Sequence, residues 1–502
     1  MISAPSRYAR PVVLPGVDGR LRQPARPATA VVIGGGLAGL AAAVVLAERG
    51  VRVTVLEREQ FLGGRAGAWT DRLKDGTAFD MERGFHAFFR QYYNLRQLLK
   101  RVDPELGFLK PTDDYPILTP TGNESFAGLT HAPLFNVAKL TWRTDTLGIR
   151  DLMKVNVPAA LAMLRFDFRQ SYADFDEVTA GAYLDSLNFP PVARQRLLHV
   201  FAHSCFNPQA DMSAADLLQM LHFYFTANYD GLVFDVADRP FSRGIFVPLG
   251  ALLGRLGADV RMGVSARALE RREGNRWVVE TDGEALAADL VVLATEVPGV
   301  KAIIGASRGL DDPDWRRQVD SLRVTNAFAV WRLWLDRPVA RGRAGFAGTA
   351  GVGPLDNISV YESLEDESRA WAARTGGSVV ELHAYALPAG FNEAALKHQL
   401  LEGLHTLYPE TVGATLIEER FLLRQDCPAF APGSHAMRPE VRTPYRGLSL
   451  AGDFVQLPFP SALMERAASA GMLAANTLLG DLNVAPEPLW SVAVRGPLAK
   501  RP

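Results

Sequence analysis

A glycine-rich loop near the start of this 502-residue chain constrains its fold more than any other feature. Residues 34–39 read Gly-Gly-Gly-Leu-Ala-Gly and lie between a short apolar run, residues 29–33, and an alanine-rich segment. This order predicts a buried strand, a tight turn and a helix. In such a turn, Gly34 permits the sharp bend, Gly36 lets the backbone approach a pyrophosphate, and Gly39 lets the helix pack on the strand. The loop therefore predicts a dinucleotide-binding βαβ unit.

A second apolar run, residues 51–56, completes this unit and is followed by Glu57. An acidic residue about 20 positions beyond the glycines accepts hydrogen bonds from ribose hydroxyls. The free N–H groups and the dipole at the N-terminus of the helix favour the phosphates. We therefore expect Glu57 to bind the ribose of the dinucleotide.

A second glycine pair and an arginine, Gly63, Gly64 and Arg65, follow this acidic residue. With them, the stretch 31–65 resembles the extended FAD-binding signature of the flavin amine oxidase and carotenoid desaturase superfamily. The resemblance implies that this second turn runs along the diphosphate of FAD, where the arginine supplies a permanent cation. It also implies an α/β fold in which a Rossmann-like FAD-binding domain is interleaved with a mixed α+β substrate domain.

Positions far along the chain match the same superfamily. Val264 matches the residue whose backbone brackets the adenine, and Met464 matches the start of the helix beneath the flavin ring. Gly452 and Asp453 match a strand end that meets the ribityl or diphosphate part of FAD. Arg466 departs from the pattern because many relatives have glycine there, which leaves the approach of the backbone to the flavin ring open.

The segment 79–94 indicates a branch of the superfamily. Its residues 84–89, Gly-Phe-His-Ala-Phe-Phe, resemble a stretch of plant-type carotene desaturases. Together with residues 455–461, it resembles the bacterial branch that converts a carotenoid β-ring into an aromatic φ-ring. The resemblance implies that Gly84 contributes to the cofactor site and that His86 lies near the flavin, as a proton acceptor or an orienting hydrogen-bond donor. A purely structural role for His86 is the alternative, and Glu82 and Arg83 are candidates for a structural ion pair.

The implied enzyme is an FAD-dependent desaturase that moves a methyl group within the carotenoid ring. A hydride passes from a ring carbon to the flavin, a methyl group migrates to the resulting allylic cation, and proton loss and a second oxidation give the arene. The alternatives are a desaturase or isomerase of linear carotenes such as phytoene or ζ-carotene, an amine oxidase, and a non-catalytic escort protein for prenyl lipids. Residues 457–460, Leu-Pro-Phe-Pro, offer one aromatic residue where amine oxidases tend to need a cage, and the intact FAD motifs argue against an escort protein. The electron acceptor is left open.

Composition limits the partners of the protein. A net charge of −1 gives no electrostatic basis for binding nucleic acid. Cys205 and Cys427 have no metal-ligand spacing, so we expect reduced thiols, no metal site and a cytoplasmic location. No apolar run has the length of a membrane span or a signal peptide. Because carotenoids are insoluble in water, we expect peripheral attachment to a membrane surface.

The order of apolar runs predicts that the two domains alternate along the chain. We expect the FAD-binding domain in residues 28–110, 241–305 and 425–485, and the substrate domain in 111–240, largely helical, and 306–424, sheet plus helix. Residues 1–27, which are rich in proline, and residues 486–502 are expected to be tails. The runs 277–281, 289–295 and 448–451 are expected to be strands of one layer in the FAD-binding domain, and 324–335, 358–361 and 379–386 strands of another sheet.

Two apolar groups lie in the helical region. Ser213 is placed to cap a helix on which five side chains share one face: Leu217, Met220, Leu221, Tyr224 and Phe225. Such a face is either ordinary core or the wall of an apolar cleft. The second group leaves the same choice open and adds a membrane-docking surface: Met153, Leu161, Met163, Leu164, Phe166 and Phe168.

Overall fold

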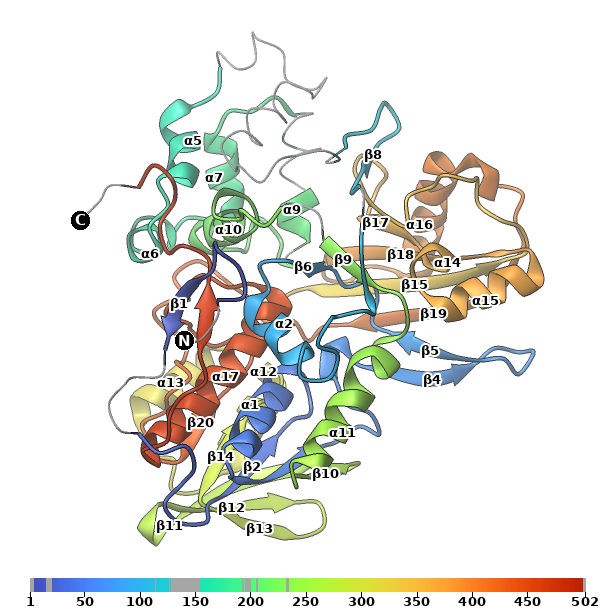
Figure 1. The fold of residues 1–502 in the computed structure, drawn as a ribbon. Helices are drawn as coiled ribbons and strands as arrows, with labels where there is room; N and C mark the ends of the chain where they lie inside the picture. Colours follow the sequence, from blue (N-terminus) through green and yellow to red (C-terminus); the bar gives the residue numbers. More distant parts are fainter. Residues whose placement is uncertain are drawn as a thin grey trace.

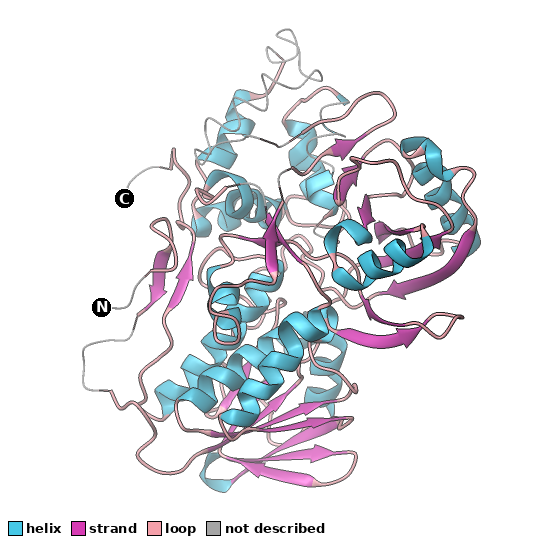
Figure 2. Cartoon of the chain, turned by 45° about the vertical axis from the view of Figure 1, so that its right-hand side comes forward, coloured by secondary structure: helices cyan, strands magenta, loops and turns pink. Residues whose placement is uncertain are grey.

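The computed structural model of the chain shows two lobes, each with its own large sheet (Figure 1). It describes residues 4–14, 20–112, 114–125, 127, 154–191, 194, 200–204, 206–231 and 234–499. Figure 2 shows the helices of the lower lobe lying against its sheet and a second group of helices beside the sheet on the right. The expected α/β fold with an added α+β part is confirmed.

The lower lobe is built on a five-stranded parallel sheet with the order β10-β3-β2-β14-β20. Its strands are β10 (Asp259–Met262), β3 (Arg52–Glu57), β2 (Thr29–Ile33), β14 (Leu290–Leu293) and β20 (Leu448–Leu450). Segments from the start, middle and end of the chain therefore pair in one sheet. Because parallel strands share a carboxyl edge, the loops after β2, β3, β14 and β20 meet on the same side.

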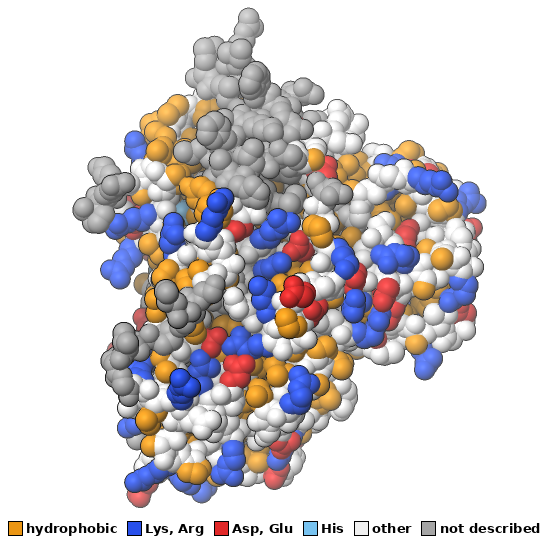
Figure 3. Space-filling model, in the orientation of Figure 1, with side chains coloured by type: hydrophobic (Ala, Val, Ile, Leu, Met, Phe, Trp, Pro, Cys, Tyr) orange, Lys and Arg blue, Asp and Glu red, His pale blue; other side chains and the backbone are white. Residues whose placement is uncertain are grey.

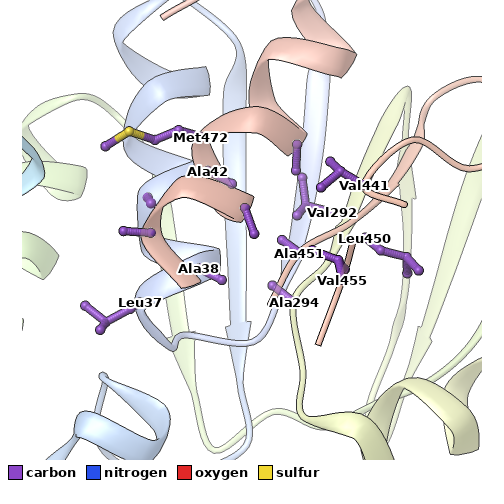
Figure 4. Close-up of a cluster of buried hydrophobic side chains, with 14 of the residues drawn as sticks. Leu37, Ala38, Ala42, Val292, Ala294, Val441, Leu450, Ala451, Val455 and Met472 are labelled. Atoms are coloured by element: carbon purple, nitrogen blue, oxygen red, sulfur yellow. The ribbon is translucent and has the colours of Figure 1, made fainter. Parts of the chain in front are cut away.

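Two helices pack closely beside this sheet, α1 (Leu37–Glu48) and α17 (Leu463–Asp481). Figure 4 shows side chains of both helices, among them Ala38 and Ala42 of α1 and Met472 of α17, in one buried cluster with Val292 and Leu450 of the sheet. Every residue of α1 except Glu48 is buried, as expected for a helix that is apolar all round. The contact needs glycine at position 471, because a Cβ there would come within 2.0 Å of the Ala38 carbonyl oxygen.

A small antiparallel sheet completes the lower lobe. It consists of β11 (Ala266–Arg272), β12 (Arg276–Thr281) and β13 (Ala285–Ala288), and the helices nearby are α11 (Val247–Arg255), α12 (Val297–Ala306) and α13 (Pro313–Ser321). The run 277–281 was expected to be a strand of the main layer, and this was wrong: it pairs with its sequence neighbours in this separate sheet. Its apolar side chains were enough to predict a strand, but they did not indicate the strands with which it pairs.

The second lobe contains a six-stranded sheet with the order β19-β15-β18-β17-β16-β8. Its strands are β19 (Leu416–Arg424), β15 (Ala327–Leu335), β18 (Ser378–Leu387), β17 (Asn357–Val360), β16 (Phe346–Thr349) and β8 (Ile117–Leu118). Helices α14 (Tyr361–Leu364), α15 (Asp366–Thr375) and α16 (Glu393–Leu407) lie beside it. Three of these strands were predicted from their apolar runs.

Helices and short strands form the part of the molecule that borders both lobes. The helices are α2 (Tyr93–Leu99), α5 (Val157–Leu164), α6 (Phe168–Phe175), α7 (Ala180–Ser186), α9 (Val200–His203), α10 (Ala214–Leu221) and two π-helical turns, η3 (His222–Thr226) and η4 (Ser242–Phe246). The strands are β4 (Ala68–Arg72) with β5 (Ala78–Glu82), and β6 (Phe88–Phe89) with β9 (Phe234–Ala237) and β7 (Leu109–Pro111). Single 3₁₀ turns are η1 (Gly64–Ala66), η5 (Glu273–Asn275) and η6 (Pro409–Thr411).

The two segments expected to be tails contain paired strands, which corrects that expectation. Strand β1 (Arg10–Val13) pairs antiparallel with β21 (Leu489–Ser491). The pairing is irregular between Pro11 and Val13, where the register shifts. Because β1 contains Pro11, the sequence did not indicate a strand there. A proline is nevertheless compatible with a two-stranded ribbon, because each strand has a free edge.

Candidate active site

One cavity of about 560 Å³ joins the carboxyl edge of the parallel sheet to the second lobe. Its walls include the first glycine loop, Glu57, the Gly63–Arg65 turn and Asp453 on one side. On the other side they include aromatic residues from the border helices and from the six-stranded sheet. The predicted dinucleotide site and the predicted substrate site are therefore parts of one space.

The first glycine loop has the geometry that its motif predicts. Gly34 has a positive φ of 108°, and a Cβ there would come within 2.5 Å of the Ala294 carbonyl oxygen. A Cβ on Gly39 would come within 1.9 Å of the Gly34 carbonyl oxygen, so glycine lets the helix approach the turn. A Cβ on Gly36 would instead meet no protein atom closer than 3.8 Å, and Gly36 lines the cavity. The space in front of Gly36 fits the pyrophosphate of a bound dinucleotide.

Glu57, at the end of β3, is fixed by backbone donors. The amide of Gly35 donates to Oε2 at 2.7 Å and the amide of Glu59 donates to Oε1 at 2.9 Å. Burial raises the pKa of Glu57, while these two amides act in the opposite direction. The amide of Val264 donates to the Glu57 carbonyl oxygen at 2.9 Å, and both residues line the cavity. The structure therefore brings Glu57 and Val264 together, as a site for the adenosine part of FAD requires.

The second glycine turn lies directly against the first. The amide of Gly63 donates to the Gly35 carbonyl oxygen at 2.8 Å, and Gly36 and Gly63 form an isolated β-bridge. Gly63 has a φ of 112°, and a Cβ there would come within 2.6 Å of the Phe246 ring. Gly64 has a φ of 58° and faces Gly36. Residues Gly63 to Arg65 all line the cavity.

Arg65 and Asp453 form an ion pair in the cavity wall, with Arg65 Nη2 and Asp453 Oδ1 2.5 Å apart. Burial opposes the charge on Arg65, but Asp453 outweighs it and raises the pKa of Arg65. The neighbouring Gly452 has a φ of 153°, and a Cβ there would overlap the Phe454 ring. All three matched residues, Arg65, Gly452 and Asp453, are thus brought to the same part of the cavity.

The start of α17 supplies Met464, which lines the cavity as expected. Leu463 also lines it and has a φ of 48°, which is rare for a leucine and turns the chain sharply into the helix. Arg466 is buried and donates to the Val455 carbonyl oxygen at 2.7 Å, and it does not line the cavity. The arginine that departs from the family pattern is therefore not part of the cavity wall.

His86 lies in the cavity wall and is held by one hydrogen bond. Its Nδ1 is 2.7 Å from the Gly84 carbonyl oxygen, and because a carbonyl only accepts, Nδ1 carries the proton. Burial lowers the pKa of His86 to about 4, so the ring is neutral at pH 7. Within the described residues, none hydrogen-bonds to its Nε2. The lone pair of Nε2 is thus available to accept a proton.

Gly84, which was expected to contribute to the cofactor site, does not line the cavity. It has a φ of 102°, and a Cβ there would come within 2.6 Å of the His383 ring. Glycine is therefore needed at this position for the contact with His383, and the Gly84 carbonyl orients His86.

The apolar face predicted after Ser213 forms a wall of the cavity. Ser213 Oγ accepts from the Ala215 amide at 3.1 Å and caps α10. All five residues of the face line the cavity: Leu217, Met220, Leu221, Tyr224 and Phe225. Further aromatic residues complete this chamber, among them Phe85 stacked on Phe346 at 4.0 Å between ring centroids. Leu217, Met220 and Leu221 also belong to the buried core, so the face is core on one side and cleft wall on the other, and each of the two interpretations holds in part.

Several lining residues were not predicted from the sequence. Arg83 pairs with Asp426 rather than with Glu82, and both members of this pair line the cavity. Cys427, a free thiol, lies beside them. Cys205 and Met153 lie outside the described residues. His383, Tyr385 and Asn357 contribute polar groups from the six-stranded sheet, and only their alternation along the strands could have indicated a shared face.

Known proteins are similar to this chain in sequence and in fold. The profile of the family "Flavin containing amine oxidoreductase" matches residues 37–479. The chain belongs to this family. The expectation of FAD as the cofactor is confirmed by this membership. A putrescine oxidase structure has a TM-score of 0.66 with 18% identity and covers 90% of this chain and 99% of its own, which supports the fold.

The family's carotenoid branch contains the more similar curated relatives. The chain is 44% identical to a carotenoid phi-ring synthase of Streptomyces griseus, over 98% of this chain and 95% of that protein. It is 27% identical to a carotenoid phi-ring synthase of Chlorobaculum tepidum, over 94% and 91%. A zeta-carotene desaturase of Synechocystis is 24% identical, over 90% and 97%. The predicted resemblance to the φ-ring branch is confirmed. This flavin-dependent oxidoreductase is therefore a carotenoid-modifying enzyme.

The described part of the chain contains no helix long and apolar enough to cross a bilayer. Among the same residues, no group of three or more His, Cys, Asp or Glu side chains could hold a metal ion.

Proposed function

We propose that the protein oxidises the β-ring of a carotenoid with a methyl shift and produces an aromatic φ-ring, as the names of its two φ-ring synthase relatives indicate. The observation that carries the proposal is the continuous cavity, in which a dinucleotide cradle opens into an apolar chamber with aromatic walls. FAD, when bound, supplies the hydride acceptor. The described residues fit it, because Gly36 leaves space for a pyrophosphate and Arg65 offers a cation beside it.

The walls suit a ring-bearing hydrocarbon. Phe346, Phe234 and Tyr115 form edge and tilted aromatic contacts with one another and line the chamber. Such walls exclude water, so a cation on the substrate is not captured by it, and aromatic faces stabilise positive charge. The lining carboxylates Asp426 and Asp453 are already paired with arginines, which disfavours a charged amine as the substrate.

His86 is the proposed proton acceptor for one proton of the ring. Its Nδ1 is held by the Gly84 carbonyl, which directs the lone pair of Nε2 away from the backbone. A neutral ring is the form that a general base requires. The cofactor roles proposed for Gly34, Gly36, Gly39, Glu57, Gly63, Gly64, Arg65, Val264, Gly452, Asp453 and Met464 rest on the geometry above.

The test is conversion of β-carotene in liposomes by the flavin-loaded protein, with pigments separated and weighed by mass spectrometry. The expected product carries four hydrogens fewer per converted ring. Oxidation of ζ-carotene or phytoene without ring products would instead show a linear-carotene desaturase, and oxidation of putrescine alone would show an amine oxidase. Either result would overturn the proposal.

Membrane attachment is the second part of the proposal and rests on helix α5. Its sequence, Val-Pro-Ala-Ala-Leu-Ala-Met-Leu, is apolar, yet none of its residues is buried, and Val157 is 56% exposed. Lys154 and Arg165 flank it and are exposed, so their positive charges can contact anionic lipid head groups. Figure 3 shows hydrophobic side chains gathered in this part of the surface, at the upper left. Because α5 packs against η3, whose Tyr224 and Phe225 line the cavity, this surface adjoins the substrate chamber.

Flotation with anionic liposomes tests this attachment. The substitution Val157→Glu is expected to reduce the bound fraction several-fold while the flavin stays bound. The control is Val412→Glu, because Val412 is 64% exposed and lies in the other lobe. Equal flotation of the two variants would contradict docking through α5.

A further inference from the structure

Three polar side chains share one face of strand β18. Residues 381–385 read Glu-Leu-His-Ala-Tyr, and because side chains alternate along a strand, Glu381, His383 and Tyr385 point to one side. The intervening Leu382 and Ala384 belong to an apolar cluster on the other side. Glu381 and His383 are almost fully buried, and polar groups are buried at such cost only when they are paired.

The neighbouring strands supply their partners in register. Arg332 of β15 lies opposite Glu381, and its Nε donates to Glu381 Oε2 at 2.9 Å. Glu381 Oε1 is 2.8 Å from His383 Nε2. His383 Nδ1 is 2.7 Å from Tyr385 Oη, and Asn357 of β17 donates to the same oxygen at 2.7 Å. These contacts form an unbroken row from a buried ion pair to a phenol.

The acceptors fix the direction of the protons. A carboxylate only accepts, so Nε2 of His383 carries a proton and donates it to Glu381. In the neutral imidazole, Nδ1 then accepts, and the Tyr385 hydroxyl donates to it. One lone pair of Tyr385 Oη receives the Asn357 amide, and the second lone pair of this oxygen remains for a further proton. This is the order of a general base, its orienting carboxylate and a hydroxyl that exchanges protons with it.

Tyr385 presents the end of this row to the substrate chamber. Tyr385, His383 and Asn357 all line the cavity, and the Tyr385 ring is in edge contact with Phe206, which also lines it. The ladder with β15 is irregular at this point, since Ala327 and Ala329 pair with Leu387 and Ala384, and Ala386 has a φ of 48°. Bulges that re-aim a side chain and residues held at positive φ occur at functional sites.

We propose that Tyr385 is a second proton acceptor of the ring reaction and passes the proton to His383. The inference rests on the proposed function, because forming one φ-ring removes two hydrides and two protons from the β-ring. Each hydride would pass to FAD, and an external two-electron acceptor would reoxidise the flavin before the second hydride transfer. At one deprotonation the ring C–H bond breaks, its electron pair forms the new C=C bond of the cation, and the proton goes to Tyr385 Oη. The original Tyr385 proton moves at the same time to His383 Nδ1, and the imidazolium formed is paired with Glu381.

The charges along the row support this transfer. Burial acts to raise the pKa of Glu381, but Arg332 and the His383 hydrogen bond outweigh it and lower that pKa to about 2, so the carboxylate is present to stabilise an imidazolium. Burial raises the pKa of Tyr385 well above its usual value, so Tyr385 acts as a phenol that relays a proton. His86 lies nearby, because both His86 and His383 contact Gly84, and in this proposal His86 is the acceptor for the other proton.

The test compares Tyr385→Phe, His383→Gln and the double variant with the parent protein. Each single variant is expected to lower the kcat for φ-ring formation about 100-fold, with KM changed less than about threefold. Because the two residues act as one unit, the double variant is expected to be no slower than the slower single variant. Equal kcat in Tyr385→Phe and the parent, or full multiplication of the two losses, would overturn the relay.

A measurement on the protein without substrate separates folding from chemistry. The free energies of unfolding of the same four proteins, with flavin retention checked by the visible spectrum, give the coupling of the Tyr385–His383 hydrogen bond. A non-zero coupling energy with retained flavin is expected. A coupling energy of zero would show that Tyr385 and His383 are not hydrogen-bonded, which would overturn the relay. Tyr408→Phe is the matched control, since it deletes a buried hydroxyl of the same lobe that makes no hydrogen bond in the described structure. If the parent protein itself forms no φ-ring, the proposed function fails, whereas an active parent with an equally active Tyr385→Phe variant overturns the relay alone.

Discussion

Arg65 and Asp453, separated by most of the chain, meet in the wall of the cavity with 2.5 Å between Nη2 and Oδ1. Arg65 follows the second glycine turn, and Asp453 follows strand β20. The pair therefore closes the dinucleotide cradle with one side chain from each end of the protein.

The role of this pair can be tested by a double-mutant cycle on FAD retention. Arg65→Met is expected to weaken FAD binding at least tenfold, about 1.4 kcal/mol, because it removes the cation beside the diphosphate. Asp453→Asn is expected to weaken it less, and the double variant no more than Arg65→Met, if Asp453 acts by holding Arg65. Equilibrium dialysis of FAD gives the constants. Arg261→Met, at an exposed pair with Asp259, is the control and should retain the parent affinity.

Substitutions in the first glycine loop can distinguish a glycine that is needed to bind FAD from one that is needed for folding. Gly36→Val is expected to abolish FAD retention while leaving the melting temperature of the apoprotein nearly unchanged, because its side chain would enter the cavity. Gly39→Val is expected to prevent folding, since it would collide with the Gly34 carbonyl. Gly305→Val is the control, because a Cβ there meets nothing within 4 Å. Flavin retention in Gly36→Val equal to that of the parent would contradict the assignment.

His86 predicts a particular pH profile. Because its pKa is lowered to about 4, it stays neutral from pH 8 downward, and the kcat should lose its His86-dependent part only as the pH approaches 4. His86→Gln is expected to lower the kcat about 100-fold with flavin still bound. The pH dependence of initial rates checks this. A loss of activity centred near pH 6.5 that disappears in His86→Gln would show that the ring is not held neutral. His405→Gln, on α16, is the control.

A second histidine, His222, predicts a pH effect on stability. It is fully buried, its Nε2 is 2.7 Å from the Ala493 carbonyl oxygen, and burial lowers its pKa to about 4. Between pH 6.5 and 4 the unfolded state binds the proton and the folded state does not, so stability falls as the pH falls through this window. The contribution is about 3 kcal/mol over the window. In urea titrations, His222→Gln should lose this part of the pH dependence, whereas exposed His398→Gln should keep it. Parallel curves for parent and His222→Gln would refute it.

Local sequence was sufficient for the cofactor cradle. The strand Thr29–Ile33, the glycine loop and Glu57 follow one another within a short stretch, so the βαβ geometry and the roles of Gly34 and Gly39 could be predicted from spacing. The same holds for the apolar face of α10, although only the structure showed that it borders a cavity as well as the core.

Several contacts between distant segments could not be predicted, although the runs 289–295 and 448–451 were correctly expected in one layer. The alternation Glu381, His383, Tyr385 is visible in the sequence, but polar residues in a strand more often face solvent, and their burial depends on Arg332 of another strand. The pairing of β1 with β21 depends likewise on two segments from opposite ends of the chain. Arg83 forms its ion pair with Asp426 and not with its sequence neighbour Glu82, because the fold brings Asp426 to the cavity wall.

The packing of α1 against α17 has a consequence for biosynthesis. The ribosome makes the first glycine turn early, but β20, Asp453 and α17, which complete the same pocket, are made much later. Until then, the nearly all-apolar helix α1 lacks its cover and is exposed to chaperones and to aggregation. Tight uptake of the vitamin-derived cofactor must therefore wait until α17 has been made, and a chain truncated before this helix is expected to bind no cofactor and to aggregate.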